Sequence, residues 1–294
     1  MDTEALRLLV AVAETGSFTK AAVRLDYTQS AVSRRIAALE QSVGGPLFER
    51  LPRGVRLSPA GRVLHRHALK VLDRLARADR ELAVLHAGSG GLLHVGGFAT
   101  AHISLLPAAL RALGESRPDV ETVVVEAPSA VLMERLADGA LDLAVISDYP
   151  YGLPSADGVT TTPLCEDELF VALPRGHPLA SAGPVDLRDL SDEAWVQHAY
   201  GDRPTLLADA WARIGGAPGK IIRIAEWTGK FGYVAAGLAV ALVPSLAAWA
   251  VPADIALCRL TDPALRRTVH VARPTTPLPA ARELEELLRV AAAR

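Results

Sequence analysis

The sequence predicts a helical N-terminal module with a β-wing, a long linker helix, and an α/β C-terminal domain of two lobes. Three observations predict this architecture. Residues 17–43 contain two short amphipathic segments around a break, and residues 64–85 follow a heptad pattern. From residue 92 onward, strand-like and helix-like segments alternate along the chain.

Composition and charge fit a nucleic-acid-binding part joined to a different domain. The chain has 294 residues, half of them apolar, which is enough for two or three domains with cores. Residues 1–90 hold 14 Lys and Arg against 9 Asp and Glu, whereas the remainder holds 17 against 24. A basic first part is typical of a DNA-binding module. The chain begins with MDTEALRLL, which lacks the apolar core of a signal peptide, so we expect a cytoplasmic protein.

Residues 17–43 predict two helices around a tight connection. Phe18, Ala21 and Leu25 share one face of the first helix, and Ser17 is placed to cap it. Thr28, or the residue after it, can cap the second helix, whose inner stripe is Val32, Ile36, Leu39 and Val43. The opposite face is polar, basic and small, and it carries Gln29, Ser30, Ser33 and Arg34. Such a face suits a helix in the major groove of DNA, although any solvent-exposed helix has a polar face.

A short basic hairpin is predicted after the second helix. Pro52 and Gly54 indicate a turn between two extended segments, and Leu47 and Phe48 are candidate core anchors. Three arginines surround this turn: Arg50, Arg53 and Arg56. The hairpin would be a wing whose arginines reach the phosphate backbone or the minor groove. A solvated basic loop is the alternative.

A long helix is predicted to begin at Pro59, where the missing N–H of proline costs nothing. Its apolar residues alternate at steps of four and three: Leu64, Ala68, Val71, Leu75, Ala78, Leu82 and Leu85. This heptad seam predicts dimerisation, which would present two recognition helices to a two-fold symmetric DNA site. A single amphipathic helix packed on a globular core is the alternative. Residues 88–91 would form a flexible hinge.

The remainder alternates between strand and helix patterns, which predicts parallel sheets with crossover helices. Expected strands are 92–98, 120–126, 141–147, 194–198, 221–225 and 237–243, with further strand-like segments from about 161 and 266. Expected helices are 104–113, 129–138, 204–214 and 279–293. The uncharged stretch 231–253 is long enough to span a membrane, but glycines and prolines divide it into a helix, a strand and another helix. We therefore expect no membrane contact.

The order of a helix, a helix-turn-helix, the LFER wing, the LSPAG phrase and a linker helix resembles the LysR-type transcriptional regulators. The matching residues are Phe18, Ala21, Ala22, Leu25, Gln29, Ser30, Ala31, Ser33, Ile36, Leu39, Glu40, Leu47, Phe48, Arg50, Leu57, Ser58, Pro59 and Gly61. The match covers residues 2–88, and the rest agrees in segment order and short phrases. This resemblance implies a DNA-binding regulator of promoter dyads that contacts RNA polymerase. It also implies a homodimer or homotetramer, and an effector-binding C-terminal domain similar to periplasmic binding proteins.

The predicted domain boundaries follow from these segments. They are 1–58 for the winged helix-turn-helix, 59–87 for the linker helix, 88–91 for the hinge and 92–294 for the effector domain. Lobe I would comprise about 92–160 and 265–294, and lobe II about 161–264.

Effector-binding candidates lie where the expected strands end. In α/β sheets, ligands bind beyond the C-terminal strand ends and at helix N-termini. The candidates are Thr100, Ala101, His102, Ser129, His198, Tyr200, Trp227 and Thr228. The resemblance implies that Thr100 and Ser129 hold an effector's carboxylate, whereas helix capping is their alternative role. His102, Tyr200 and Trp227 would stack on or hydrogen-bond a ring, or belong to the core.

A strongly anionic effector is not favoured by the basic residues of this region. No arginine or lysine stands clearly at a strand end that faces the expected cleft, although Lys230 and Arg203 are near. Hydroxyl groups and helix N-termini would then have to hold the anion.

Other function classes fit less well. The two lobes alone would suit a solute-binding protein of a transporter, but the N-terminal third opposes this, and a regulator without a small-molecule effector stays open. Ser129, His102 and Asp148 can be drawn as a catalytic triad, yet the chain has no GxSxG and no phosphate loop. We expect no enzyme, no cofactor and no metal. Cys165 and Cys258 lack metal-site spacing and are expected to be buried thiols, with a redox pair as the alternative.

Overall fold

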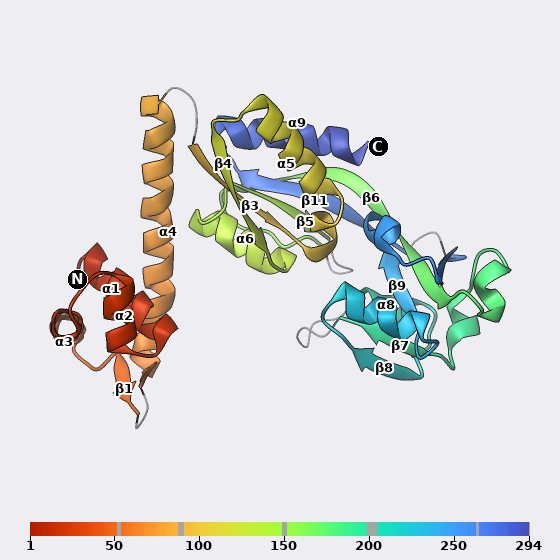
Figure 1. Ribbon diagram of the computed structural model, residues 1–294, viewed down its shortest axis with the longest axis horizontal. Helices are drawn as coiled ribbons and strands as arrows, with labels where there is room; N and C mark the ends of the chain where they lie inside the picture. The colour runs from red at the N-terminus through yellow and green to blue at the C-terminus, as the bar shows by residue number, and fades with distance from the viewer. Residues whose placement is uncertain (52–53, 88–90, 149–151, 199–204, 263–264, 294) are drawn as a thin grey trace. The chain divides into compact units, whose positions relative to one another are not determined.

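A computed structural model of the chain describes all residues except 52–53, 88–90, 149–151, 199–204, 263–264 and 294. Internal contacts divide the chain into two units, and Figure 1 labels their elements. The N-terminal unit is Met1–Gly91 with Asp138–Ala140, and the C-terminal unit is Leu92–Ala137 with Leu141–Arg294. Within the described residues, no helix combines the length and apolar character needed to cross a membrane.

Three short helices form the body of the N-terminal unit: α1 (Thr3–Thr15), α2 (Phe18–Arg24) and α3 (Gln29–Val43). The predicted caps are confirmed, because the Ser17 hydroxyl accepts from the Lys20 N–H and the Thr28 hydroxyl accepts from the Ala31 N–H. Gly16, in the left-handed conformation that glycine adopts readily, ends α1. The helices enclose a core of small and branched side chains that includes Leu8, Leu9, Val12, Ala21, Ala22, Val32, Ile36 and Leu39.

The predicted hairpin is present as β1 (Phe48–Arg50) and β2 (Val55–Leu57), which pair antiparallel. Gly54 has φ +93°, and a Cβ at this position would lie 2.6 Å from the Gly16 carbonyl oxygen. The Val55 N–H donates to that same carbonyl at 3.0 Å. The hairpin is therefore tied to the end of α1, and only glycine fits its turn. Pro52 and Arg53 lie outside the described residues.

The linker helix α4 (Pro59–Ala87) begins at Pro59, as predicted. Leu64 and Ala68, the first two residues of the heptad seam, pack into the core of the N-terminal unit. Further along, Val71, Leu75 and Leu82 are 43%, 40% and 50% exposed, and Ala78 is exposed as well. The side chain of Leu85 lies outside the described residues. The start of the seam therefore packs within the chain, as the alternative interpretation expects, whereas dimerisation through the exposed stretch stays a prediction.

The C-terminal unit is built on a seven-stranded sheet of order β10-β6-β11-β5-β3-β4, with β9 also paired to β6. Its strands are β3 (Gly91–Gly97), β4 (Val120–Glu126), β5 (Leu143–Ser147), β6 (Val159–Pro174), β9 (Ala241–Pro244), β10 (Ile255–Arg259) and β11 (Arg266–Pro274). A second sheet pairs β7 (Ala194–Gln197) with β8 (Lys220–Arg223). The helices are α5 (Leu105–Ser116), α6 (Ser129–Asp138), α7 (Leu206–Arg213), α8 (Trp227–Ala235) and α9 (Pro279–Ala292). Four 3₁₀ turns complete it: η1 (Ala99–His102), η2 (Pro178–Ser181), η3 (Leu187–Leu190) and η4 (Ser245–Ala250).

The large sheet is mixed, so the prediction of parallel sheets is only partly right. β3 and β5 run parallel, and so do β7 and β8, but β11 is antiparallel to both β5 and β6. The first half of β6 pairs with β11, and its second half pairs with β9 and β10. β6 and β11 cross between the two lobes, and they run antiparallel because one leaves the first lobe and the other returns to it.

Helices cover both faces of the first lobe's sheet (Figure 1). Leu143 and Val145 of β5 pack with α5 and α9, whereas Ala144 and Ile146 pack with α6. The continuous apolar run of β5 follows from this arrangement, because a strand that is covered on both faces has no solvent side.

Candidate nucleic-acid interface and effector site

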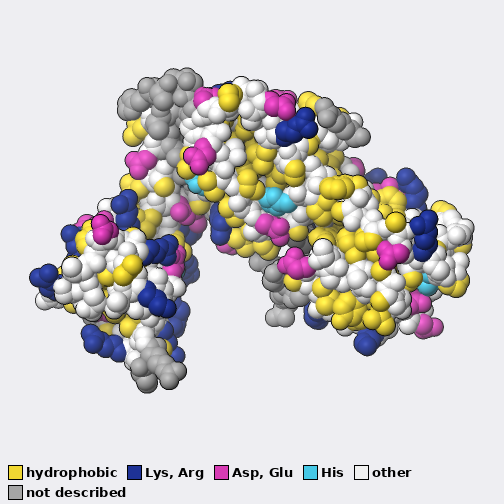
Figure 2. Space-filling view, in the orientation of Figure 1, with side chains coloured by type: hydrophobic (Ala, Val, Ile, Leu, Met, Phe, Trp, Pro, Cys, Tyr) yellow, Lys and Arg dark blue, Asp and Glu magenta, His cyan; other side chains and the backbone are white. Residues whose placement is uncertain are grey.

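The outer face of α3 carries the residues predicted to read DNA. Gln29, Ser30 and Arg34 are exposed, and Ser33 is half-buried. The Gln29 Nε2 donates to the Ser33 Oγ at 3.1 Å, and the Arg34 Nε lies 3.4 Å from the Ser30 carbonyl oxygen. These exposed local contacts keep the side chains along the helix surface, and each is weak enough to be exchanged for a base edge. Figure 2 shows Lys and Arg side chains over much of the N-terminal unit's surface.

The arginines of the wing differ in their electrostatic partners. Arg56 pairs with Glu49 across the hairpin, with Nε–Oε2 2.8 Å and Nη2–Oε2 2.7 Å. Arg50 is exposed and forms no ion pair with the residues that the structure describes. Arg53 lies outside the described residues. Of the two predicted phosphate contacts that the structure describes, Arg56 is therefore the one whose charge is already partly neutralised.

Glu40 supports the recognition helix in a way that the sequence interpretation missed. Its Oε1 accepts from the backbone N–H of Leu47 at 2.7 Å and of Phe48 at 3.2 Å. The carboxylate thus fixes the start of the wing against α3. Tyr27 plays a comparable part, since its hydroxyl donates to Glu4 of α1 at 2.9 Å. Spacing alone does not reveal either role, because each joins two elements through one side chain.

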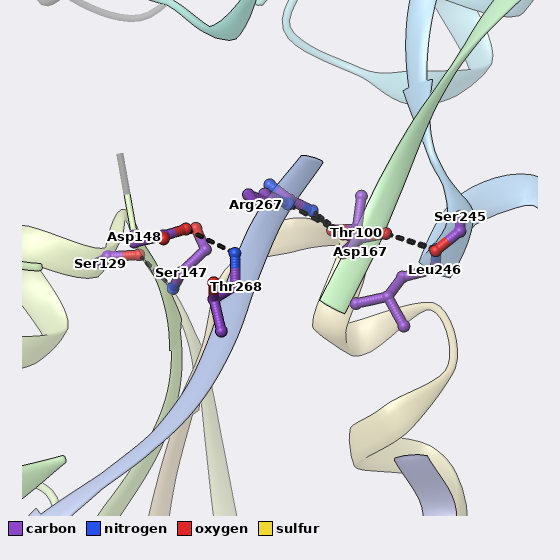
Figure 3. A network of polar contacts seen from close by, with 9 residues as sticks. All are labelled: Thr100, Ser129, Ser147, Asp148, Asp167, Ser245, Leu246, Arg267 and Thr268. Atoms are coloured by element: carbon purple, nitrogen blue, oxygen red, sulfur yellow. Dashed lines mark hydrogen bonds and ion pairs between the residues drawn. The ribbon is translucent and has the colours of Figure 1, made fainter. Parts of the chain in front are cut away.

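Thr100 lies in η1, directly beyond the C-terminal end of β3, as expected for a ligand-binding residue. It is only 3% exposed, and its Oγ1 accepts from the Arg267 Nη2 at 2.6 Å. Arg267 also binds the Asp167 Oδ2 through Nε at 2.8 Å and Nη2 at 2.7 Å. The guanidinium lies 4.7 Å from the centre of the Phe98 ring. Figure 3 shows this network, in which β11 supplies the arginine and β6 the carboxylate.

Asp167 connects the network to the start of η4. It is fully buried, and its Oδ1 accepts from the Ser245 hydroxyl at 2.7 Å and the Leu246 N–H at 3.0 Å. Arg267 corrects the expectation that no arginine stands at a strand end near the candidate residues. The alternation of RRTVHVARP contained a signal, because one of two adjacent arginines in a strand must face inward.

Ser129 begins α6 and is fully buried. Its Oγ accepts from the Ser147 N–H at 3.1 Å, and Ser147 ends β5. Next to it, the Asp148 Oδ1 accepts from the Thr268 N–H at 2.7 Å. Thr100 contacts Arg267 of β11 directly. Ser129 contacts Ser147, and the next residue, Asp148, contacts Thr268 of β11 (Figure 3). The two predicted hydroxyl residues are therefore both linked to the start of β11.

The remaining candidates of the first lobe are engaged in structural contacts. Ala101 is fully buried in the core. His102 lies with Nε2 3.2 Å from the Gly97 carbonyl oxygen. Ser129, His102 and Asp148 each contact a different backbone group, and no hydrogen bond that the structure describes joins any two of them. This arrangement gives no support to a catalytic triad.

In the second lobe, the predicted residues gather where β7 and β8 end and α8 begins. His198 is exposed, and its Nδ1 lies 2.9 Å from the Ala225 carbonyl oxygen. Trp227 packs on Phe231 with ring centres 5.6 Å apart, and Thr228 is exposed. Tyr200 and Arg203 lie outside the described residues.

Lys230 is the unexpected member of this group, because it is only 5% exposed. Its Nζ lies 4.2 Å from the centre of the Trp227 ring and 3.5 Å from the His198 Nδ1. Burial lowers the pKa of Lys230 to about 8, against the opposing influence of Glu226. Desolvation and the charge of Lys230 together lower the pKa of His198.

Both cysteines are free thiols, Cys258 buried and Cys165 half-buried. Burial raises the pKa of Cys165 to about 11, with Asp167 and Glu166 acting in the same direction. A thiol with so high a pKa is a poor nucleophile, which argues against the redox alternative for this residue.

Two family models match the chain. "Bacterial regulatory helix-turn-helix protein, lysR family" matches residues 3–62, and "LysR substrate binding domain" matches residues 86–293. The chain is 30% identical over 273 residues to a probable HTH-type transcriptional regulator LrrA of Synechococcus elongatus, covering 92% of this chain and 90% of that protein. It is 29% identical to a probable cat1 operon transcriptional activator of Acinetobacter lwoffii, covering 84% of this chain and 82% of that protein.

Solved structures agree over the full length. Full-length CbnR complexed with its target DNA superposes with a TM-score of 0.77 at 25% identity, covering 99% of this chain and 100% of that chain. Full-length BenM superposes with a TM-score of 0.63 at 26% identity, covering 100% and 97%.

Proposed function

The chain belongs to the LysR family of DNA-binding transcriptional regulators, and from that premise we propose which of its residues read DNA and which bind the effector. Its N-terminal helix-turn-helix binds DNA, and its C-terminal domain is the family's effector-binding domain. The observation that carries the DNA-reading proposal is the exposed polar face of α3 above a closed apolar core.

In this proposal α3 enters the major groove with Gln29, Ser30, Ser33 and Arg34 toward the bases. Gln and Arg make paired hydrogen bonds to base edges, and serines bind phosphates or bases. Arg50 and Arg53 contact phosphates from the wing, and Arg56 contributes less because Glu49 holds it.

Dimerisation through α4 completes the DNA-binding unit. The exposed seam residues Val71, Leu75, Ala78 and Leu82 support this, because a row of apolar side chains at heptad spacing matches the packing surface of a two-helix coiled coil. Two copies of the chain then place two recognition helices on a dyad, either as a homodimer or within a homotetramer.

The effector is an organic anion in this proposal, held by the hydroxyls of Thr100 and Ser129. Each hydroxyl accepts a hydrogen bond from a fixed donor, the Arg267 guanidinium or the Ser147 N–H. A hydroxyl that already accepts still has its proton to donate, and that proton suits a carboxylate oxygen. The guanidinium beside Thr100 adds positive charge that the sequence interpretation did not foresee.

Ligand binding would act on the crossing strands. A carboxylate at Thr100 shares Arg267 with Asp167, which links β6 to η4. A ligand changes the arrangement of the lobes only if it binds the two arrangements with different affinity. We propose that this change alters DNA binding and contact with RNA polymerase in the cytoplasm.

The test is footprinting on the DNA upstream of the protein's own gene, with and without candidate organic acids. We expect protection of a dyad whose extent changes with one acid. Arg34→Ala should lose about 1–3 kcal/mol of discrimination between the site and its base-substituted variants. Arg35→Ala, the neighbouring exposed arginine, is the matched control and should weaken all sequences alike. Equal discrimination by Arg34→Ala and the parent would refute the docking model, and a footprint insensitive to every acid would favour a regulator without a small-molecule effector.

A further inference from the structure

Lys230 is a buried ammonium group that no carboxylate of the described residues pairs with. The residue is 5% exposed, and its side chain contacts the face of Trp227 and the ring of His198. Among the described residues, no carboxylate oxygen lies within 4.0 Å of its Nζ. Burying an ammonium group costs folding free energy unless the group is paired or hydrogen-bonded. The charge of Lys230 therefore destabilises the unliganded fold.

His198 does not serve as the hydrogen-bond acceptor for Lys230. Its Nδ1 lies 2.9 Å from the Ala225 carbonyl oxygen, and a carbonyl oxygen only accepts. The Nδ1 therefore carries a proton and donates to Ala225. A protonated ring nitrogen has no lone pair for the ammonium 3.5 Å away. The contact between the two side chains is consequently repulsive or neutral, which agrees with the lowering of the His198 pKa by burial and by the charge of Lys230.

The ammonium lies over the first turn of α8. Helical side chains lean toward the N-terminus of their helix, and Trp227, whose ring lies under Nζ, is the first residue of α8. This helix has no acidic residue in its first turn, and its N-cap residue Glu226 makes no side-chain cap hydrogen bond. The first N–H groups of a helix lack intrahelical partners and favour an anion. Thr228 adds an exposed hydroxyl in the same turn.

Two carboxylates act on this cluster from its edge. Glu226 raises the pKa of Lys230, and Glu126 at the end of β4 raises that of His198, each against the larger effect of burial. Both glutamates are exposed, so solvent screens them. Lys230 is the buried charge of this cluster, so its positive sign favours an anion here.

We propose that Lys230, the Thr228 hydroxyl and the first N–H groups of α8 form an anion subsite for a small-molecule carboxylate, with Trp227 packing against the carbon skeleton of that ligand. The inference rests on the proposed effector function and deepens it, because it assigns a second charged contact to the lobe opposite Thr100. It also predicts that binding depends on the protonation of Lys230. The ammonium form is the binding form, so affinity falls as pH rises through about 8.

The chain's four lysines make this subsite directly measurable: Lys20, Lys70, Lys220 and Lys230. Full-length protein labelled with ¹³C-lysine is titrated by NMR in chloride, and then in acetate, benzoate or phosphate at equal ionic strength, and Lys230→Met identifies the signal. We expect the pKa of Lys230 to rise by at least about half a unit in the carboxylate salts, because a bound anion favours the charged form. The exposed Lys220 should not respond. A larger rise in phosphate than in either carboxylate, or no rise in any salt, would overturn the proposal of a carboxylate subsite.

A binding experiment gives the second readout. Benzoate and its neutral analogue benzamide are titrated into the full chain at pH 7 and pH 9 while tryptophan fluorescence is followed. We expect benzoate to bind more tightly than benzamide at pH 7, and Lys230→Met to weaken benzoate binding about 10- to 100-fold. Lys220→Met is the matched control and should bind as the parent does. Unchanged benzoate binding by Lys230→Met, or equal affinity at the two pH values, refutes the subsite.

Failure of this inference is distinguishable from failure of the proposed function. If Thr100→Val abolishes a ligand-dependent footprint while Lys230→Met leaves ligand affinity unchanged, the effector function stands and the subsite is wrong. If benzoate binds through Lys230 but changes no footprint, the subsite stands without a regulatory role. Lys230→Met is not expected to lower the thermal stability of the unliganded protein, since it removes a buried charge that no carboxylate of the described residues pairs with. A marked loss of stability would mean that Lys230 has a structural role, and would count against the proposal.

Discussion

The ion pair between Arg267 and Asp167 is the contact whose removal should cost the C-terminal unit most. Asp167 is fully buried, and the Arg267 side chain is 11% exposed. Arg267→Met leaves a buried carboxylate with only the Ser245 hydroxyl and the Leu246 N–H as partners. Breaking a buried pair from one side costs about 3–5 kcal/mol of unfolding free energy. Because two donors still stabilise the Asp167 carboxylate, we expect a loss of about 3 kcal/mol. For a unit of this size, that corresponds to a fall in Tm of about 6–12 °C.

Tryptophan fluorescence is the appropriate assay, because all four tryptophans lie between residues 195 and 249 and therefore report on the C-terminal unit. Arg266→Met is the matched control. This neighbouring arginine is exposed and pairs with exposed Glu166 at 3.4 Å, so its loss should cost about 0–1 kcal/mol. The double variant Arg267→Met/Asp167→Asn should recover about half of the loss, because it removes the stranded charge. Equal destabilisation by the two arginine variants, or no recovery in the double variant, would refute the reasoning.

Three further predictions concern the N-terminal unit. Arg50→Ala should reduce the salt dependence of DNA binding by about one phosphate contact, and Arg56→Ala by less, as measured by titrations at several salt concentrations; a larger effect at Arg56 would contradict the pairing argument. Gly54→Ala should destabilise the N-terminal unit by about 1–3 kcal/mol, because φ is +93° and the new Cβ would meet the Gly16 carbonyl. Faster hydrogen exchange of the α1 amides would report this destabilisation, and unchanged exchange would contradict it. Leu75→Glu, at a 40% exposed seam position, should give folded monomers in sedimentation, whereas an unchanged mass would exclude this seam as the dimer contact.

The sequence predicts the N-terminal unit well because its signals are local. Ser17 and Thr28 cap the helices that they precede, and Gly16 and Gly54 stand where the backbone needs positive φ. Each of these features depends on residues only a few positions away. The polar face of α3 follows from the same periodicity, so the positions of the DNA-reading candidates on the helix surface are also predictable, although their contacts with bases remain a proposal.

The sheet of the C-terminal unit is less predictable. Alternating strands and helices favour parallel pairing, and β3 with β5 and β7 with β8 do pair that way. β6 and β11 instead cross between the two lobes in opposite directions, and they pair with each other over nine residue pairs from Arg266↔Glu168 to Pro274↔Val159. No pattern within either segment encodes the identity of its partner, because the period of two indicates which side faces inward but not which strand lies alongside.

The charged residues at the candidate effector site show where this limit matters for function. The alternation around Arg267 predicts that one arginine faces inward, and the apolar run around Lys230 predicts burial, but neither pattern identifies the partner of the charged group. Arg267 is paired because Asp167, 100 positions earlier, lies on the antiparallel neighbour strand. Lys230 meets His198, 32 positions earlier, whose ring nitrogen is already engaged by Ala225. Two buried cations that look alike in the sequence therefore differ in chemistry: one belongs to a closed ion pair that stabilises the fold, and the other keeps a charge that an incoming anion can neutralise.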